Sequence, residues 1–292
     1  MSTGPNPREV SPTIERWLRS TLGPIGRAQE LRRIFELHGA EWYLRPRMGF
    51  QAFLRFVLRN TRYIEIPLTS TRYRSMKCYS YGPPDPFVLG VSLRGGAYLS
   101  HGSALHLHGL GPPTKRIYVN REQHPKPRPD SAPTQEAIDR SFANNPRISN
   151  YVLKWKRYSF VMLSGKNTGR LQVVALTTPG GDTVEATGLE RTLIDAAVRP
   201  VYCGGVQQVA NAYREAKPRV IAGTLLNTLE KLEHVYPYHQ AIGFYMQRAD
   251  YDDADVEGFR ALGTPFKFYL ENKPRSPKYS PEWHVHYPRN LI

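Results

Sequence analysis

The chain has 292 residues, of which 40% are hydrophobic and 22% are charged. This composition is typical of a globular protein, and the length leaves room for two domains with sizeable cores. The longest nearly uninterrupted apolar run, Phe87 to Leu93, is seven residues long, far below the roughly 20 residues that span a bilayer. Met1 to Pro12 is polar and lacks the charged and then apolar order of a signal peptide. We therefore expect no membrane contact and a cytoplasmic protein.

The net charge is strongly positive, with 40 Lys and Arg against 25 Asp and Glu, a formal charge of +15 and an isoelectric point near 9.9. A chain this basic attracts polyanions, and nucleic acid is the first candidate. Residues 1–95 carry 15 basic and 7 acidic side chains, whereas the rest of the chain carries 25 and 18. The positive charge is therefore concentrated in the N-terminal third.

Three helices are predicted in this N-terminal third. Apolar residues recur at helical spacing over residues 13–20, 28–37 and 48–60. Gly39 is suited to end the second helix, and residues 42–44 are predicted as a short strand.

The third helix carries the clearest pattern. Its apolar face consists of Phe50, Phe53, Leu54, Val57 and Leu58. Gln51, Arg55 and Arg59 are spaced four residues apart and form one polar stripe. Gln and Arg side chains bind adenine and guanine edges bidentately in the major groove. The stripe therefore predicts base contacts, although a solvated helix face that happens to be rich in arginine would show the same spacing.

A basic hairpin follows this helix, with strands predicted over residues 63–66 and 75–81. Its cations are Arg62, Arg72, Arg74 and Lys77. Helices followed by a basic hairpin predict a winged helix-turn-helix domain whose wing contacts phosphates of double-stranded DNA. Residues 40–47 separate the second and third helices more widely than usual. Which helix enters the groove stays open, with Arg27, Arg32 and Arg33 as the alternative set.

Residues 82–86 read as a linker, which places the domain boundary near residue 83 and gives domains 1–83 and 84–292. The second domain alternates strand-like and helical segments, which predicts an α+β fold with a mixed sheet and helices to one side. The helices are expected over residues 87–93, 100–108, 134–144, 189–198, 206–216, 224–234 and 240–247. The strands are expected over residues 116–120, 151–155, 159–163, 171–177, 183–186, 266–270 and 283–287.

Several histidines invite a metal hypothesis, which their spacing does not favour. On a helix, His106 and His108 point about 200° apart, and His101 lies roughly 10 Å from His108 along the axis. His284 and His286 share one face of a strand but lack further ligands nearby in the sequence. We expect no metal site and no cofactor.

Other local patterns have ordinary structural interpretations. Residues 250–255 lack the glycine and terminal glutamate of a calcium loop and are expected to form a solvated acidic loop. Residues 164–169 are expected to form a turn between strands rather than a phosphate-binding loop. Cys78 and Cys203 are too few and too far apart for a disulfide framework or zinc site.

The most distinctive stretch of the chain is the helix expected over residues 189–198. Thr187 is the predicted N-cap, with Glu190 completing a capping box. Glu190 and Asp195 point about 140° apart, which favours structural rather than paired catalytic carboxylates. Two arginines are expected to neutralise these acids as surface charges: Arg191 and Arg199.

Four segments together resemble the AbiEi family, the antitoxin and transcriptional-regulator half of bacterial type IV toxin–antitoxin pairs. They are Tyr98 to Leu110 (YLSHGSALHLHGL), Arg116 to Gln123 (RIYVNREQ), Glu190 to Gly205 (ERTLIDAAVRPVYCGG) and Tyr236 to Tyr245 (YPYHQAIGFY). They occur in the family's order, and the resemblance covers the chain from about residue 13 to the end.

The resemblance implies an N-terminal domain that binds repeats in the promoter of its own operon, and hence an autorepressor. It also implies a C-terminal domain that counters a toxin of nucleotidyltransferase type, with or without direct contact between the two proteins. On this resemblance we expect the protein not to be an enzyme. No heptad or dimerisation helix is visible, so the oligomeric state stays open.

The competing hypothesis is a metal-dependent nuclease or another enzyme acting on nucleic acid. Its carboxylates would be Asp182, Glu185 and Glu190, which lie within nine residues of one another. A divalent cation bound by these groups would distinguish this hypothesis from the antitoxin.

Overall fold

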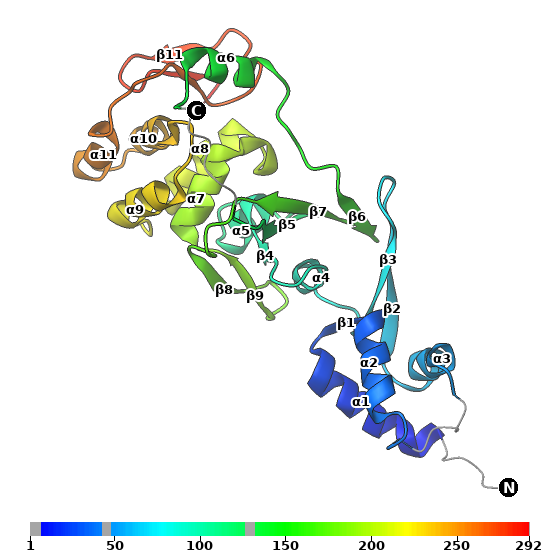
Figure 1. Cartoon of the computed structure of the whole chain (residues 1–292). Helices are drawn as coiled ribbons and strands as arrows, with labels where there is room; N and C mark the ends of the chain where they lie inside the picture. Colours follow the sequence, from blue (N-terminus) through cyan, green and yellow to red (C-terminus); the bar gives the residue numbers. More distant parts are fainter. Residues whose placement is uncertain (1–6, 43–47, 126–131, 292) are drawn as a thin grey trace, which may run out of the picture.

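The computed structural model describes residues 7–42, 48–125 and 132–291. An N-terminal unit of three helices and a small sheet lies at one end of the molecule, and a larger unit follows it (Figure 1). No helix of the described residues is long and apolar enough to cross a bilayer.

The N-terminal unit alternates helices with the strands of a three-stranded antiparallel sheet of order β1-β3-β2. Its elements are α1 (Pro7–Leu22), β1 (Ile25–Arg27), α2 (Ala28–His38), α3 (Phe50–Asn60), β2 (Tyr63–Leu68) and β3 (Met76–Tyr81). The three predicted helices and both hairpin strands are present. β1 was not predicted, because three residues are too few to show a strand period. Of the strand expected over residues 42–44, Trp42 lies in a turn, and residues 43 and 44 lie outside the described residues.

The apolar positions of the three helices converge on one core. Ile14 and Leu18 of α1, Leu31 of α2, and Phe53 and Val57 of α3 are all buried there. Spacings of three and four residues place these side chains on one face of each helix. The opposite faces of the helices are thereby left to solvent.

The larger unit is built on a six-stranded mixed sheet of order β6-β7-β5-β4-β9-β8. Its strands are β4 (Tyr98–Leu99), β5 (Arg116–Glu122), β6 (Val152–Trp155), β7 (Tyr158–Gly165), β8 (Val173–Thr177) and β9 (Thr183–Thr187). β5 and β7 run parallel, as do β4 and β9, and the other neighbours are antiparallel. The predicted α+β class with a mixed sheet is confirmed.

The helices cover both faces of this sheet, so the expectation of helices to one side was wrong. α4 (Pro86–Ser92) packs on the face that carries Ile117 and Val119, where Gly90 allows close approach. α5 (His101–Leu107), α7 (Leu189–Val198) and the turn η1 (Pro200–Tyr202) lie toward the other face, where Tyr118 contacts Tyr202. Because side chains alternate along a strand, β5 supplies apolar groups to both layers.

A helical layer and a small sheet complete the unit. The remaining elements are α6 (Gln135–Ala143), α8 (Val206–Ala216), α9 (Ala222–Leu232), α10 (Tyr238–Arg248), α11 (Asp253–Arg260), β10 (Phe268–Tyr269), β11 (Lys278–Ser280) and β12 (Val285–Tyr287). Trp283 packs against Gly243 of α10, where any Cβ would lie 2.2 Å from the indole ring. The small sheet is therefore anchored to α10.

Two local expectations in this unit were wrong. The expected acidic loop over residues 250–255 contains the start of α11, because its acids occupy the first helical turn, where they are favourable. The N-cap of α7 is Gly188 rather than Thr187. The hydroxyl of Thr187 instead hydrogen-bonds with Thr192, and Glu190 accepts the backbone N–H of Ile221.

The two units share apolar packing in addition to the covalent connection at residues 82–85. The β2–β3 hairpin extends toward β6 (Figure 1), where Thr69 and Lys154 exchange two backbone hydrogen bonds of 2.8 and 3.0 Å. At the hairpin tip, Tyr73 stacks on Tyr151 with ring centroids 4.4 Å apart. Leu68 is buried in one cluster with side chains of the larger unit. The hairpin is therefore also a docking element.

Candidate nucleic-acid interface

The polar stripe of α3 faces solvent. Gln51, Arg55 and Arg59 are all exposed, on the side of the helix opposite the buried Phe53 and Val57. α3 contains no acidic residue, and neither arginine has an ion-pair partner among the described residues. The two guanidinium groups are thus available to an external anion without first breaking an internal contact.

The cations of the hairpin differ in whether they already have an ion-pair partner. Lys77 pairs with Glu65 at 2.9 Å, and Glu65 also accepts a hydrogen bond from Tyr79. Burial and the Glu65 carboxylate raise the pKa of Tyr79 to about 12, so this phenol stays protonated and can donate that bond. Arg72 and Arg74 are exposed and flank the docked Tyr73. Lys77 is therefore largely neutralised, whereas the two arginines are not.

A cation that the sequence did not single out lies beside the hairpin. Arg19, in the last turn of α1, lies over the ring of Tyr81 at 4.4 Å, and Arg62 approaches the same ring at 5.9 Å. This contact joins residues that are far apart in the chain. In the sequence, the only indication that Arg19 could contact a partner was its place on the polar side of the first predicted helix.

The alternative set on and before α2 is less available. Arg27 pairs with Glu30 at 3.1 Å, and Arg32 lies over the ring of Phe50 at 4.6 Å. Arg33 is exposed and has no ion-pair partner in the described part of the chain. Geometry therefore favours α3 over α2 as the helix with free cationic side chains.

Two of the three carboxylates of the nuclease hypothesis have separate partners within the protein. Glu185 pairs with Arg170 at 2.7 Å, and Glu190 accepts the N–H of Ile221 at 3.2 Å. Asp182 is exposed in the turn between β8 and β9. Within the described ranges, no group of three or more His, Cys, Asp or Glu side chains is arranged to hold a metal ion.

The histidines considered as ligands make separate contacts. His101 hydrogen-bonds with Ser100 at 2.8 Å, and burial lowers the pKa of its imidazole to about 4. His108 contacts the carbonyl of Thr187, and His286 stacks on Tyr269.

Arg191, expected as a surface charge, is buried instead. Its Nε donates to Asp195 at 2.9 Å, and the two side chains are only 7% and 11% exposed. Its Nη1 donates to the hydroxyl of Thr168 and to the carbonyl of Leu171. Burial tends to lower the pKa of Arg191, but the Asp195 carboxylate beside it raises the pKa overall. This face of α7 lies against the loop between β7 and β8, which supplies these two acceptors. Arg199, by contrast, is exposed.

The turn expected over residues 164–169 binds a carboxylate of the protein itself. Ser164 and Gly165 still belong to β7, and the turn follows them. The N–H groups of Thr168 and Arg170 donate to the carboxylate of Glu122. Burial raises the pKa of Glu122, but these hydrogen bonds outweigh it and lower the pKa overall. The loop therefore holds a carboxylate of its own chain.

Comparison with known proteins identifies the fold. No model of a known protein family matches the chain, and no curated protein matches it. Among solved structures, the chain is similar to the crystal structure of the RV2827C protein from Mycobacterium tuberculosis, with a TM-score of 0.56 and 13% identity. The match covers 98% of this chain and 94% of that chain. The likeness therefore spans both units, and at this identity it concerns the fold alone.

Proposed function

We propose that the protein is a DNA-binding transcriptional regulator whose N-terminal unit is a winged helix-turn-helix. The order helix, strand, helix, helix, strand, strand and the sheet order β1-β3-β2 support this proposal. In this arrangement α3 is the recognition helix and the β2–β3 hairpin is the wing.

The observation that carries the proposal is the exposed, acid-free stripe of Gln51, Arg55 and Arg59 on α3. A helix of this kind fits the major groove, where arginine binds guanine and glutamine binds adenine through paired hydrogen bonds. Arg62, Arg72 and Arg74 would contact phosphates beside the groove, which positions the helix without reading sequence.

We further propose, from the resemblance to AbiEi antitoxins, that the DNA is the promoter of the protein's own operon. The larger unit would then counter a toxin of nucleotidyltransferase type encoded beside it. This part of the proposal rests on the four sequence segments that carry the resemblance.

The test of DNA binding uses the full chain, because the hairpin packs against the larger unit and a fragment would expose Leu68 and its neighbours. Footprinting of the upstream DNA should show a protected site, and the Arg55→Ala, Arg59→Ala double variant should lose it. Arg289→Ala, an exposed arginine of the larger unit, is the matched control. Equal protection by the double variant and the wild type would disprove the role of α3.

The antitoxin role is tested separately by growth rescue. The full-length double variant, co-expressed with the neighbouring toxin from an independent promoter, should still restore growth while failing to repress the native promoter. Loss of both properties in a folded double variant would show that protection depends on the DNA-binding surface.

A further inference from the structure

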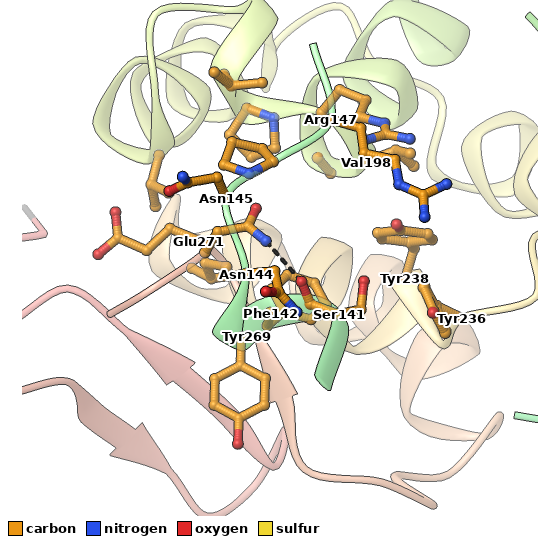
Figure 2. A pocket seen from close by; sticks show the side chains of 18 of the residues that line it. Ser141, Phe142, Asn144, Asn145, Arg147, Val198, Tyr236, Tyr238, Tyr269 and Glu271 are labelled. Atoms are coloured by element: carbon orange, nitrogen blue, oxygen red, sulfur yellow. Dashed lines mark hydrogen bonds between the residues drawn. The ribbon is translucent and has the colours of Figure 1, made fainter. Parts of the chain in front are cut away.

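A cavity of about 540 Å³ opens in the larger unit. Its walls come from the ends of β5 and β7, the loop after β7, the first residue of α5, one face of α7, and the segments that precede β6 and that join α9 to α10. A second cavity of about 800 Å³ adjoins it and shares Arg147, Val198, Arg199, Tyr236 and Tyr238 as lining residues. Figure 2 shows this second cavity, with Arg147 and Tyr238 on the same side. The shared residues make the two cavities one continuous cleft.

The cleft carries an excess of positive charge. Arg147 and Arg199 are exposed and have no ion-pair partner among the described residues. Lys166 also lines the cleft, but its ammonium lies 3.9 Å from the carboxylate of Glu233 and donates to the carbonyls of Leu232 and Glu233. The acids among the described lining residues are Asp195 in the smaller cavity and Glu271 in the larger one, and Asp195 is already paired with Arg191. Positive charge within a concave surface attracts anions more strongly than the same charge on a convex surface.

The charge is not explained by helix stability alone. Arg199 follows the last residue of α7, where a cation complements the helix dipole. Arg147 comes from the segment between α6 and β6, where no such dipole is present. The two guanidinium groups therefore reach the cleft from separate elements.

An unsatisfied polar atom lies in the same wall. His234 Nε2 is buried and has no hydrogen-bond partner in the part of the chain that the structure describes. Buried polar atoms in proteins are nearly always paired, so Nε2 is an unfilled hydrogen-bonding position beside the cleft. Burial lowers the pKa of His234 to about 4, and the neutral imidazole can therefore donate or accept a hydrogen bond at neutral pH.

Three tyrosine rings also line the cleft. Tyr236 and Tyr238 line both cavities, and Tyr202 lines the smaller one. The ring of His234 meets that of Tyr238 edge-on at 5.2 Å. Tyrosine rings offer stacking surfaces to planar bases, whereas a simple inorganic anion needs none.

We infer that this cleft binds a nucleoside phosphate, with the phosphate at Arg147 and Arg199 and the base against Tyr236 and Tyr238. The planar guanidinium matches phosphate bidentately. The volume of each cavity, about 540 and 800 Å³, lies within the range of small-molecule sites, roughly 300 to 1,000 Å³. Each of the four segments that carry the family resemblance supplies a lining residue: His101, Asn120, Arg199 and Tyr236.

The inference is tested by calorimetric titration of the full chain with ATP, GTP, CTP and UTP, and with adenosine and inorganic phosphate as partial ligands. At least one nucleotide should bind, and both partial ligands should bind at least tenfold more weakly than that nucleotide. Arg147→Ala and Arg199→Ala should each weaken binding about tenfold or more, whereas Arg289→Ala should leave it unchanged. The Arg55→Ala, Arg59→Ala double variant should also retain full nucleotide affinity, which separates this cleft from the DNA surface.

Three results would overturn the inference: no binding of any nucleotide by the folded wild type, unchanged affinity in both cleft arginine variants, or inorganic phosphate binding as tightly as the nucleotides.

Tyr236→Leu, first checked for unchanged thermal unfolding, should reduce nucleotide binding and leave phosphate binding unaltered. Should this variant unfold, His234→Gln provides the second probe and should change affinity without abolishing it. If a 5′-phosphorylated dinucleotide displaces the bound nucleotide, the cleft also accepts the phosphorylated end of a nucleic acid.

Discussion

Helices α3 and α7 both carry an arginine four residues from a second charged group, yet the structure uses the two pairs in opposite ways. Arg55 and Arg59 of α3 are exposed and repel one another, with no acid on the helix. Arg191 and Asp195 of α7 are buried and joined at 2.9 Å. Identical spacing therefore leaves open whether a charge serves a partner molecule or the protein's own fold. Burial, which depends on distant elements, distinguishes the two.

The largest effect is expected from breaking the Arg191–Asp195 pair of α7. Arg191→Ala leaves the carboxylate of Asp195 buried without its partner, which typically costs about 3–5 kcal/mol of folding free energy. Urea denaturation should show this loss, and the Arg191→Ala, Asp195→Ala double variant should lose less than the two single variants added together. Additive losses would mean that the two side chains stabilise the fold independently.

The second prediction concerns His101 and His234, which lie near the Arg191–Asp195 pair. Burial lowers the pKa of each imidazole in the folded protein from 6.5 to about 4. Between these values the unfolded chain binds protons that the folded chain does not, so stability is complete above pH 6.5 and falls as the pH drops toward 4. Each histidine contributes a slope of at most about 1.4 kcal/mol per pH unit. Denaturation at pH 7 and pH 5 should show this loss, and His234→Gln should reduce it.

His124→Gln is the control variant, because it removes an imidazole that the fold leaves exposed. An unchanged slope in His234→Gln would mean that this histidine is accessible to protons in the folded protein.

The third prediction concerns the exposed stripe. Arg55→Ala should weaken binding to the specific DNA site by about 1–3 kcal/mol and should affect random DNA much less, because a lost base contact removes discrimination. Unlike Arg191→Ala, it should leave thermal unfolding unchanged. Fluorescence anisotropy with both DNAs measures the difference, and an equal loss on both would assign α3 a phosphate-contacting role.

The smallest effect is expected at the hairpin. Each phosphate contact that is removed should lower the slope of log affinity against log salt by about one unit. Removing Arg72 and Arg74 should therefore lower the slope by about two units, whereas Lys77→Ala should change it little, because Glu65 already neutralises this lysine. A full unit lost in Lys77→Ala would show that DNA displaces Glu65 from this pair.

The sequence by itself determined the elements with a long, regular period. The helices α3, α7 and α8, the hairpin strands and the polar stripe of α3 follow from spacing alone, because local periodicity reports which face of an element is apolar. Very short strands such as β1 and β4 could not be found this way, and the acids at residues 250–255 concealed the start of α11.

Only the tertiary structure decided which charges are buried and which cavities form. The sequence predicts that Arg191 is a surface residue, but it is buried because α7 packs its charged face against the loop between β7 and β8. The docking of the hairpin on β6 and the gathering of Arg147, Lys166, Arg199 and His234 around one cleft join segments up to 87 residues apart. Such contacts depend on how elements pack in three dimensions, which no local period encodes.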